Sequence, residues 1–294
     1  MSNNSNYVFD TESAEEMARL IEQDRLVTRA MGGLFAGISA TEQERLRTVL
    51  DIACGPGGWV LDVAFARPDL EVAGVDISNI MIAYASARAR SQQLTNASFE
   101  IMDITKPLEF SDATFDLVNA RYLFAALQRE QWQPFLPECT RLVRPGGWLR
   151  LTEPINLGIS NSPAHRAYMR LFVKALWRAG YGLAPDEESL DSTFVLPRML
   201  RELGYESIQY LPSVIDISLT APGWAENYHN YRLGGAAAKP LFVKTGVASQ
   251  EEVDRLYDQM LIEMMQEGFC GFLHLATISA RKPEDMRVEL SSQG

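Results

Sequence analysis

Between residues 48 and 152, short apolar runs alternate with longer segments whose apolar residues recur every three or four positions. An apolar run of roughly four to eight residues predicts a buried strand, and the wider spacing predicts a helix. We therefore expect strands at 48–53, 71–76, 97–102, 115–120 and 148–152, and helices at 58–66, 79–94 and 131–143. Repeated strand–helix units with apolar strands predict an α/β fold in which helices cover both faces of a parallel sheet.

The pattern changes on both sides of this region. Residues 13–30 and 41–47 predict two helices before it. After Glu153 the alternation stops, and residues 154–193 are helical in pattern with no evident strand. The later expectations are a helix at 196–203, a strand at 207–219, a segment rich in Gly, Ala and aromatic residues at 221–246, an amphipathic helix at 250–266 and a last strand at 269–280.

Composition narrows the class of partner. The chain has 294 residues, 47% of them hydrophobic, and a net charge of −11. Because a strongly acidic protein repels phosphate backbones, we expect no nucleic-acid partner. The nearest group of basic residues, Arg141, Arg144 and Arg150, has a spacing that fits the solvated side of a helix and turn.

Cysteine use and hydropathy bear on the compartment. Cys54, Cys139 and Cys270 are odd in number, and no two have a metal-ligand or redox spacing, so we expect a reducing compartment and no metal site. The first six residues are polar, and no stretch approaches the roughly 18 apolar residues that a membrane span needs. We expect a cytoplasmic monomer or homodimer with no membrane partner.

A glycine-rich turn joins the first expected strand to the helix at 58–66. It reads Cys54-Gly55-Pro56-Gly57-Gly58, and such turns let a backbone approach a ligand closely at a helix N-terminus. The turn predicts a nucleotide-like cofactor. A dinucleotide fold would place a third glycine where Val60 stands, so the spacing alone does not identify the cofactor.

Three acids and a second turn accompany this one. Asp51 ends the first strand, Asp76 ends the second, and Asp103 follows the third. Residues 144–147, Arg-Pro-Gly-Gly, form a tight turn before the fifth strand. Together with the fourth-strand segment at 115–120, these landmarks resemble a class I S-adenosylmethionine-dependent methyltransferase.

The resemblance covers residues 48–152 strongly and 196–281 more loosely. It implies a doubly wound, mostly parallel seven-stranded sheet with an antiparallel last strand and helical lid insertions. The segments expected on this basis are a helical cover at 1–47, a cofactor-binding Rossmann-like core at 48–153, a lid insertion at 154–194, a core helix and strand at 195–220, a second lid insertion at 221–268, and the last strand and tail at 269–294.

The resemblance also implies where S-adenosyl-L-methionine binds. Gly55 and Gly57 would cradle its methionine end, which Asp51 would face, while Asn119 and Ala120 would present backbone near the sulfonium. Asp51 could instead accept hydrogen bonds from the loop, and Ala120 would be apolar in any α/β core.

By the same resemblance, residues at and beyond the ends of the second and third strands would bind the adenosine part of the cofactor. Asp76 would bind the ribose, Ile77 would pack on the adenine, and Asp103 with Ile104 would hold its other edge. The two isoleucines would also be apolar in any α/β core. Tyr7 and Gln23 of the N-terminal arm could close over the cofactor.

The methyl acceptor should bind where the lid segments meet the core. Their many bulky side chains predict a small, partly apolar or aromatic metabolite. Substrate-binding candidates are Arg121, Tyr122, Trp177, Trp224 and Tyr228. Candidate catalytic groups are His229, His165 and Tyr122, which could act on a hydroxyl acceptor, although packing alone could account for each of these side chains.

Two alternatives to methyl transfer remain. Some relatives of this kind bind S-adenosylmethionine and promote cyclisation or rearrangement of a natural product, and their cofactor landmarks would be the same. A non-catalytic subunit with a degenerate fold is disfavoured by the intact acids and glycines. In-line displacement from a sulfonium requires no metal, and aligning the reactants can contribute about 7–11 kcal/mol.

Overall fold

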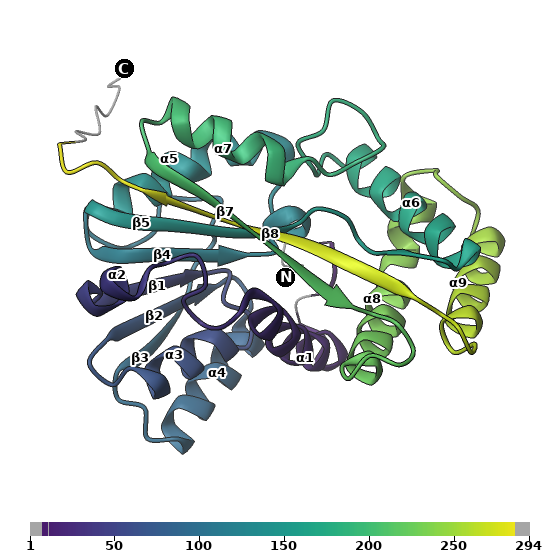
Figure 1. Ribbon diagram of the computed structural model, residues 1–294, viewed down its shortest axis with the longest axis horizontal. Helices are drawn as coiled ribbons and strands as arrows, with labels where there is room; N and C mark the ends of the chain where they lie inside the picture. Colours follow the sequence, from purple (N-terminus) through teal and green to yellow (C-terminus); the bar gives the residue numbers. More distant parts are fainter. Residues whose placement is uncertain (1–7, 11, 286–294) are drawn as a thin grey trace.

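The computed structural model describes residues 8–10 and 12–285 (Figure 1). Tyr7 therefore lies outside the described residues. No helix in these ranges is both long and apolar enough to cross a membrane.

One mixed sheet organises the described chain. Its strands are β1 (Thr48–Ile52), β2 (Glu71–Asp76), β3 (Ala97–Ile101), β4 (Phe115–Arg121), β5 (Val143–Pro154), β6 (Ile159–Ser160), β7 (Glu206–Asp216) and β8 (Gly271–Arg281). Their order is β3-β2-β1-β4-β5-β8-β6, with β7 also paired to β8. Strands β1 to β5 are parallel, and β8 runs antiparallel to each of its neighbours. The predicted fold class is confirmed, and the two-residue β6 lies in a segment where no strand was expected.

Helices cover both faces of the sheet and build a second body beside it. They are α1 (Ala14–Met31), α2 (Ala40–Arg45), α3 (Gly58–Ala66), α4 (Asn79–Ser91), α5 (Trp132–Leu142), α6 (Pro163–Arg178), α7 (Ser192–Glu202), α8 (Trp224–Lys244) and α9 (Gln250–Met264), with short 3-10 helices η1 (Leu123–Ala125) and η2 (Arg129–Gln131). Figure 1 shows α3 and α4 on one side of the sheet, α5 and α7 on the other, and α6, α8 and α9 beyond its end.

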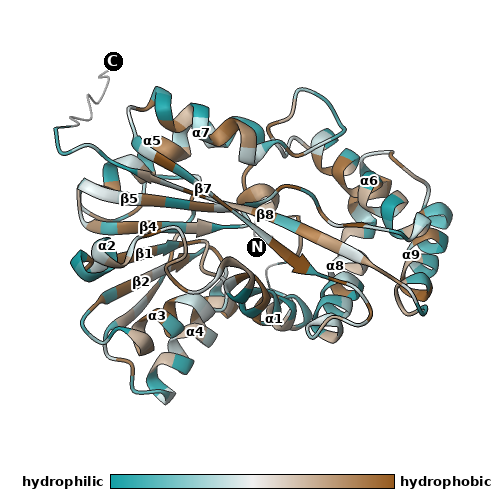
Figure 2. Ribbon diagram, in the orientation of Figure 1, coloured by the Kyte–Doolittle hydropathy of each residue, from teal (hydrophilic) through white to brown (hydrophobic). Residues whose placement is uncertain are grey.

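The two-residue period of the strands divides the buried side chains between the faces. In β1, Val49 belongs to the apolar cluster under α3, whereas Leu50 packs with α5 and α7. In β4, Leu117 and Val118 divide in the same way. Figure 2 shows the resulting hydrophobic strands beneath helices whose outer surfaces are hydrophilic. The sheet is therefore buried on both faces, as its apolar runs predicted.

A further apolar cluster joins α1 to α6, α8 and α9 and to the far ends of β7 and β8. It forms because β7 and β8 extend well past the parallel strands, and these helices pack beside the extended part (Figure 1). In α8, Gly235 lies so close to α9 that a Cβ there would stand 3.0 Å from the Tyr257 ring. The glycines that obscure a helical pattern in 221–246 thus allow close packing of two helices.

Two sequence predictions are corrected by the fold. Arg150 is fully buried in β5, so the prediction that it lies on a solvated face was wrong. Residues 145–147 fall inside β5 instead of preceding it, and there the pairing shifts from Phe115↔Val143 to Leu117↔Trp148. Gly146, with φ 76°, permits this irregularity.

Candidate functional site

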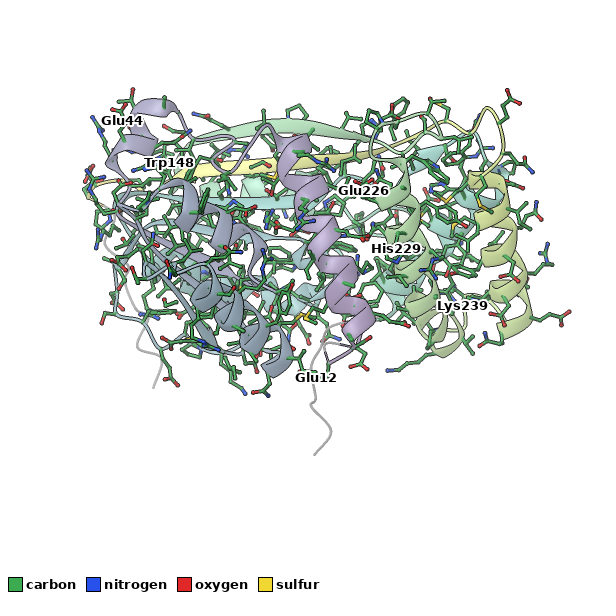
Figure 3. All side chains as sticks on the ribbon, turned by 90° about the horizontal axis from the view of Figure 1, so that it is seen from below. Glu12, Glu44, Trp148, Glu226, His229 and Lys239 are labelled. Carbon is green, nitrogen blue, oxygen red and sulfur yellow. The ribbon has the colours of Figure 1, made fainter. Side chains whose placement is uncertain are left out.

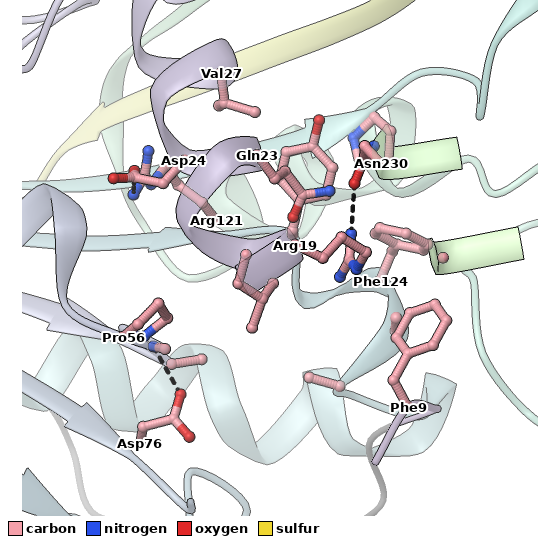
Figure 4. A pocket seen from close by; sticks show the side chains of 18 of the residues that line it. Phe9, Arg19, Gln23, Asp24, Val27, Pro56, Asp76, Arg121, Phe124 and Asn230 are labelled. Atoms are coloured by element: carbon pink, nitrogen blue, oxygen red, sulfur yellow. Dashed lines mark hydrogen bonds and ion pairs between the residues drawn. The ribbon is translucent and has the colours of Figure 1, made fainter. Parts of the chain in front are cut away.

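A cavity of ≈ 230 Å³ lies between the carboxyl ends of the parallel strands and helices α1, α6 and α8. Its strand-end half is lined by residues at or after the carboxyl ends of β1, β2 and β3: Asp51, Ala53, Cys54, Gly55, Pro56, Gly58, Asp76, Ile77, Ser78, Met81, Asp103, Ile104 and Thr105. Its lid half is lined chiefly by Phe9, Val27, Phe124, Tyr168, Met169, Phe172, Tyr231 and Leu273. Figure 4 shows Pro56 and Asp76 at one end of the cavity and Phe9 and Phe124 toward the other. One cavity therefore joins an acidic end to an apolar end.

The glycine turn is shaped by backbone conformation and by packing. Gly55 and Gly57 have φ values of 53° and 74°, which favour glycine. A Cβ at Gly57 would lie 2.6 Å from the Phe99 ring and 2.7 Å from Ala85 Cβ, whereas the nearest such atom at Gly55 is Leu20 Cδ1 at 3.7 Å. Gly55 lines the cavity and Gly57 does not. Gly57 thus serves the packing of the turn, while Gly55 leaves space on the cavity side.

Asp76 ties the turn to the end of β2. Its Oδ2 accepts a hydrogen bond from Gly55 N at 2.8 Å, and its Oδ1 accepts one from Ser78 N at 3.0 Å. Burial raises the pKa of Asp76, and these backbone amides oppose the rise. A carboxylate has about four lone-pair positions, so Asp76 keeps acceptor capacity toward a ligand.

Asp103 and Ile104 lie at the neighbouring strand end. Although burial acts against it, hydrogen bonds from Thr105 N and Oγ1, at 3.0 and 2.7 Å, and the ion pair with Lys106 hold the pKa of Asp103 below its ordinary value. The carboxylate is therefore ionised and fixed at the cavity edge beside Ile104.

Asp51 is the terminal member of a buried polar chain. Its Oδ1 accepts a hydrogen bond from Asn119 Nδ2 at 2.6 Å, and Asn119 Oδ1 accepts one from Arg150 Nε at 2.8 Å. Burial raises the pKa of Asp51 to about 6, while Arg121 and Asn119 act to lower it. Asn119 and Ala120 are fully buried and do not line the cavity. Asn119 is thus positioned to orient Asp51.

Arg150 is the buried inner end of this series of hydrogen bonds. Its guanidinium lies 5.1 Å from the Trp59 ring centroid, and its Nη1 donates to the carbonyls of Leu34 and Ala36 at 2.7 and 3.2 Å. Burial and the nearby Arg121 lower the pKa of Arg150 to about 9. Nothing in the sequence pattern distinguished this arginine from Arg141 and Arg144, which are only partly buried.

Helix α1 closes the cavity from the N-terminal side. Arg121, at the end of β4, pairs with Asp24 at 2.6 Å and donates to Thr28 Oγ1 at 3.1 Å. Asp24 also lies where a side chain at Gly58 would stand, so it covers the N-terminus of α3. The sequence had singled out Gln23 on this helix, which does line the cavity, but it missed Asp24. A helical period from Leu20 places both residues on the inward face.

Among the described residues of the lid half, Arg19 is the charged one that lines the cavity, and its charge is compensated. Arg19 makes two hydrogen bonds of 2.7 Å to the Glu16 carboxylate and donates to Asn230 Oδ1 at 2.8 Å (Figure 4). Both Arg19 and Glu16 are 5% exposed. The polar groups at this end of the cavity are therefore joined across α1 and α8.

The two candidate histidines lie outside the cavity lining. His165 is fully buried, its Nδ1 lies 3.1 Å from Ser160 Oγ, and burial lowers its pKa to about 4. His229 Nδ1 lies 2.7 Å from Glu22 Oε2, where α8 packs on α1 (Figure 3). Both make contacts that join structural elements, and neither enters the function proposed below.

Of the five residues expected to bind the methyl acceptor, Arg121 and Tyr122 line the cavity. Trp177 instead donates to Ala184 O at 3.2 Å, and Trp224 stacks on Tyr228 with ring centroids 5.1 Å apart. These three aromatic residues pack within the lid and are absent from the cavity lining.

Comparisons with known proteins identify the kind of domain. Residues 49–147 match the family model described as a methyltransferase domain. The chain is 31% identical over 199 residues to a trans-aconitate 2-methyltransferase of Methylobacterium radiotolerans, covering 66% of each chain, and 33% identical over 178 residues to the N-methyltransferase tcpN of Claviceps purpurea, covering 58% of this chain and 60% of the relative. Among the first curated relatives it matches, the chain covers from 47% to 66% of their length.

A solved structure shares the fold. The crystal structure of a putative methyltransferase from Bacillus halodurans C-125 aligns with a TM-score of 0.50 and 16% identity, over 88% of this chain and 98% of that one. At this identity the likeness concerns the fold alone.

Proposed function

We propose that this chain, which belongs to the class I S-adenosylmethionine-dependent methyltransferase family, transfers a methyl group to a small, neutral and largely apolar acceptor. The observation that carries the proposal is the single cavity that joins acidic strand ends to an apolar lid half. Its two ends differ in chemistry in the way that a polar cofactor and an apolar acceptor would require.

The strand-end residues fit S-adenosylmethionine. Gly55 has a backbone conformation that glycine adopts readily, and Asp76 keeps acceptor capacity for a ribose hydroxyl. Asp103, with Ile77 and Ile104, supplies a carboxylate and apolar surface for a base. When bound, this cofactor supplies an electrophilic methyl group on a sulfonium.

The protein's own residues then act by position and charge. Asp51, held by Asn119, would receive the cationic amino group of the methionine end. Arg121 and Asp24 hold α1 over the cavity and so exclude water from it. Fixing two reactants in line can lower a barrier by about 7–11 kcal/mol, so no acid or base need be invoked for an acceptor that is already nucleophilic.

Charge argues for a neutral acceptor. The two arginines of the cavity lining, Arg19 and Arg121, are paired with Glu16 and Asp24 respectively. A polycarboxylate such as trans-aconitate, named for one relative, would bring negative charge toward arginines that are already compensated and toward Asp51. Aromatic and aliphatic side chains form most of the remaining surface of the lid half.

The test is the formation of S-adenosylhomocysteine with a panel of acceptors. Neutral aromatic alcohols and amines are expected to give product, and trans-aconitate is expected to give none. Asp76→Ala is expected to reduce product formation with every acceptor when S-adenosylmethionine is subsaturating. Turnover of trans-aconitate above that of the neutral compounds would contradict the acceptor class. Conversion of a substrate without S-adenosylhomocysteine would instead favour the cyclisation or rearrangement alternative.

A further inference from the structure

Asn230 is a polar residue on the face of α8 that lines the lid half of the cavity. The lining residues of α8 lie one and four positions apart, a spacing that marks a single helix face: Asn230, Tyr231, Gly234 and Gly235. The side chain is half-buried, and Figure 4 shows its amide directed toward the guanidinium of Arg19 on α1. A side-chain amide therefore stands among the largely apolar side chains of this half.

Arg19 determines which end of the amide is left for another partner. Its Nη1 donates a hydrogen bond to Asn230 Oδ1 at 2.8 Å. A guanidinium has no acceptor, so only the oxygen end of the amide can face it. The Nδ2 end, with its two N–H donors, is thereby turned away from α1. Because a cation on the amide oxygen polarises the whole group, these donors are strengthened.

A buried ion pair holds Arg19 in this position. Its Nε and Nη2 donate to the two carboxylate oxygens of Glu16, each at 2.7 Å, and both residues are 5% exposed. A Cβ at Gly234 would already touch Arg19 Cδ at 3.5 Å, so a longer side chain there would crowd the guanidinium. Since desolvation offsets much of the attraction within a buried ion pair, its effect here lies more in orientation than in stability.

The Nδ2 donors of Asn230 are both unpaired and open. Within the described residues Nδ2 has no hydrogen-bond partner, and it is not among the unpaired atoms that the fold shields from solvent, as the Tyr122 hydroxyl is. The hydroxyls of Tyr168 and Tyr231 are already used, donating to the carbonyls of Gly235 and Leu157 at 2.6 and 2.9 Å. An apolar ligand that displaced water from Nδ2 would leave these donors unpaired, which costs affinity unless the ligand itself supplies an acceptor atom.

We propose that the methyl acceptor carries a hydrogen-bond-accepting oxygen, of the carbonyl kind, which Asn230 Nδ2 binds in the lid half, and that Arg19 with Glu16 positions Asn230 for this contact. This inference rests on the proposed function and narrows its acceptor class. The donor is uncharged, and it therefore recognises a neutral oxygen without requiring a carboxylate on the ligand. Asn230 is the residue that touches the ligand, whereas Arg19 and Glu16 act through it.

The experiment compares acetophenone with ethylbenzene, two neutral probes of similar shape of which only the first has a carbonyl oxygen. The dissociation constant of each is measured by NMR titration in the presence of S-adenosylhomocysteine. Asn230→Leu is expected to lower the ratio of acetophenone affinity to ethylbenzene affinity by about 3- to 10-fold relative to the wild type, the value of one net hydrogen bond. Comparing ratios between proteins removes the difference in hydration between the two probes.

Two further variants show which atom of Asn230 is responsible. Asn230→Asp keeps an oxygen for Arg19 but removes both donors, so it is expected to lower the ratio at least as far as Asn230→Leu. Asn227→Leu is the matched control, because Asn227 lies one turn earlier on α8, outside the cavity lining, and its Nδ2 already donates to Gly223 O at 2.8 Å. This control is expected to lose thermal stability and to keep the ratio of the wild type.

The outcomes separate this inference from the function on which it rests. An unchanged ratio in both Asn230 variants would overturn the inference and leave the neutral acceptor class intact. Binding of neither probe by the wild-type protein would contradict the acceptor class, and this inference with it. Affinity for S-adenosylhomocysteine, measured separately by calorimetry, reports the strand-end half of the cavity.

The positioning role of Arg19 is tested through Asn230 by a double-mutant cycle. Glu16→Gln combined with Arg19→Met removes both charges together and so leaves neither of them buried and unpaired. The combined variant is expected to lower the affinity ratio by a smaller factor than Asn230→Leu, because the amide is then free to rotate. In the Asn230→Leu background the same pair of substitutions is expected to leave the ratio unchanged. A further fall in that background would overturn the positioning role, since it would mean that Arg19 acts on the probe directly.

Discussion

Replacing Glu153 with glutamine should change how the stability of this protein depends on pH. The carboxyl group is fully buried and accepts two backbone hydrogen bonds, from Leu123 and Phe124, and no cation among the described residues acts on its pKa. Burial raises its pKa from 4.5 to about 8, and the two amides oppose the rise. The folded protein therefore holds a proton there at neutral pH that the unfolded chain releases.

The sign and size follow from proton linkage. Between pH 4.5 and 8 the folded state binds one more proton than the unfolded state, so stability is greatest below the lower value and falls as the pH rises toward the upper one. Each tenfold change in proton affinity is worth about 1.4 kcal/mol, which gives a total loss of up to about 5 kcal/mol. From pH 5.5 to 9 the expected loss from this group is about 3 kcal/mol.

Glutamine removes this proton and keeps the shape of the side chain. It loses one acceptor toward the backbone, so Glu153→Gln should be less stable than the wild type by about 1–3 kcal/mol near pH 5.5. Toward pH 9 the deficit should vanish or reverse, because the variant has no carboxylate to bury.

The assay is urea unfolding of both proteins at several pH values between about 5.5 and 9, with the difference in unfolding free energy plotted against pH. Glu267→Gln, at an exposed position, is the control and should give a flat difference. A flat difference for Glu153→Gln as well would refute the reasoning, since it would mean that the buried carboxyl is ionised in the folded protein throughout this range.

Three further predictions concern the cavity. Asp76→Ala should weaken S-adenosylmethionine binding at least about tenfold in calorimetry, because a hydrogen bond to a charged group contributes about 1.5–3 kcal/mol, and unchanged affinity would exclude the ribose assignment. Gly57→Ala should lower the free energy of unfolding in urea by about 1–3 kcal/mol, because the alanine Cβ would meet the Phe99 ring at 2.6 Å and because φ at this position is positive. An unchanged unfolding free energy would show that the turn can relax. Arg121→Met should speed hydrogen exchange in α1, because it leaves Asp24 unpaired. Adding Asp24→Asn to this variant should restore part of the protection. Equal exchange in the wild type, the single variant and the double variant would show that this ion pair does not hold α1.

The strand-end half of the cavity could be predicted because its residues are specified by local pattern. Asp51 lies one residue before the end of β1, Asp76 ends β2, and Asp103 lies two residues after the end of β3. Carboxyl ends of neighbouring parallel strands meet at one edge, so residues far apart in sequence converge without any knowledge of side-chain packing. The structure brings all three acids, with Gly55, Ile77 and Ile104, to one cavity.

The lid half could not be predicted in the same way. Aromatic residues in the lid segments look alike in sequence, yet Tyr168 and Tyr231 line the cavity whereas Trp177 and Trp224 do not. Helix α8 was obscured by Gly234, Gly235 and Pro240, because its stability comes from close packing on α9 and not from its own propensity.

The sequence by itself therefore determined the order of strands and helices in the core, its parallel character and the acids at its strand ends, because these depend on periodicity and on residues adjacent in the chain. Only the tertiary structure decided that Arg150 is buried, that Asp24 closes on Arg121, and that Arg19 fixes the amide of Asn230. Each of these depends on contacts between elements distant in sequence, whose distances and burial no local pattern encodes.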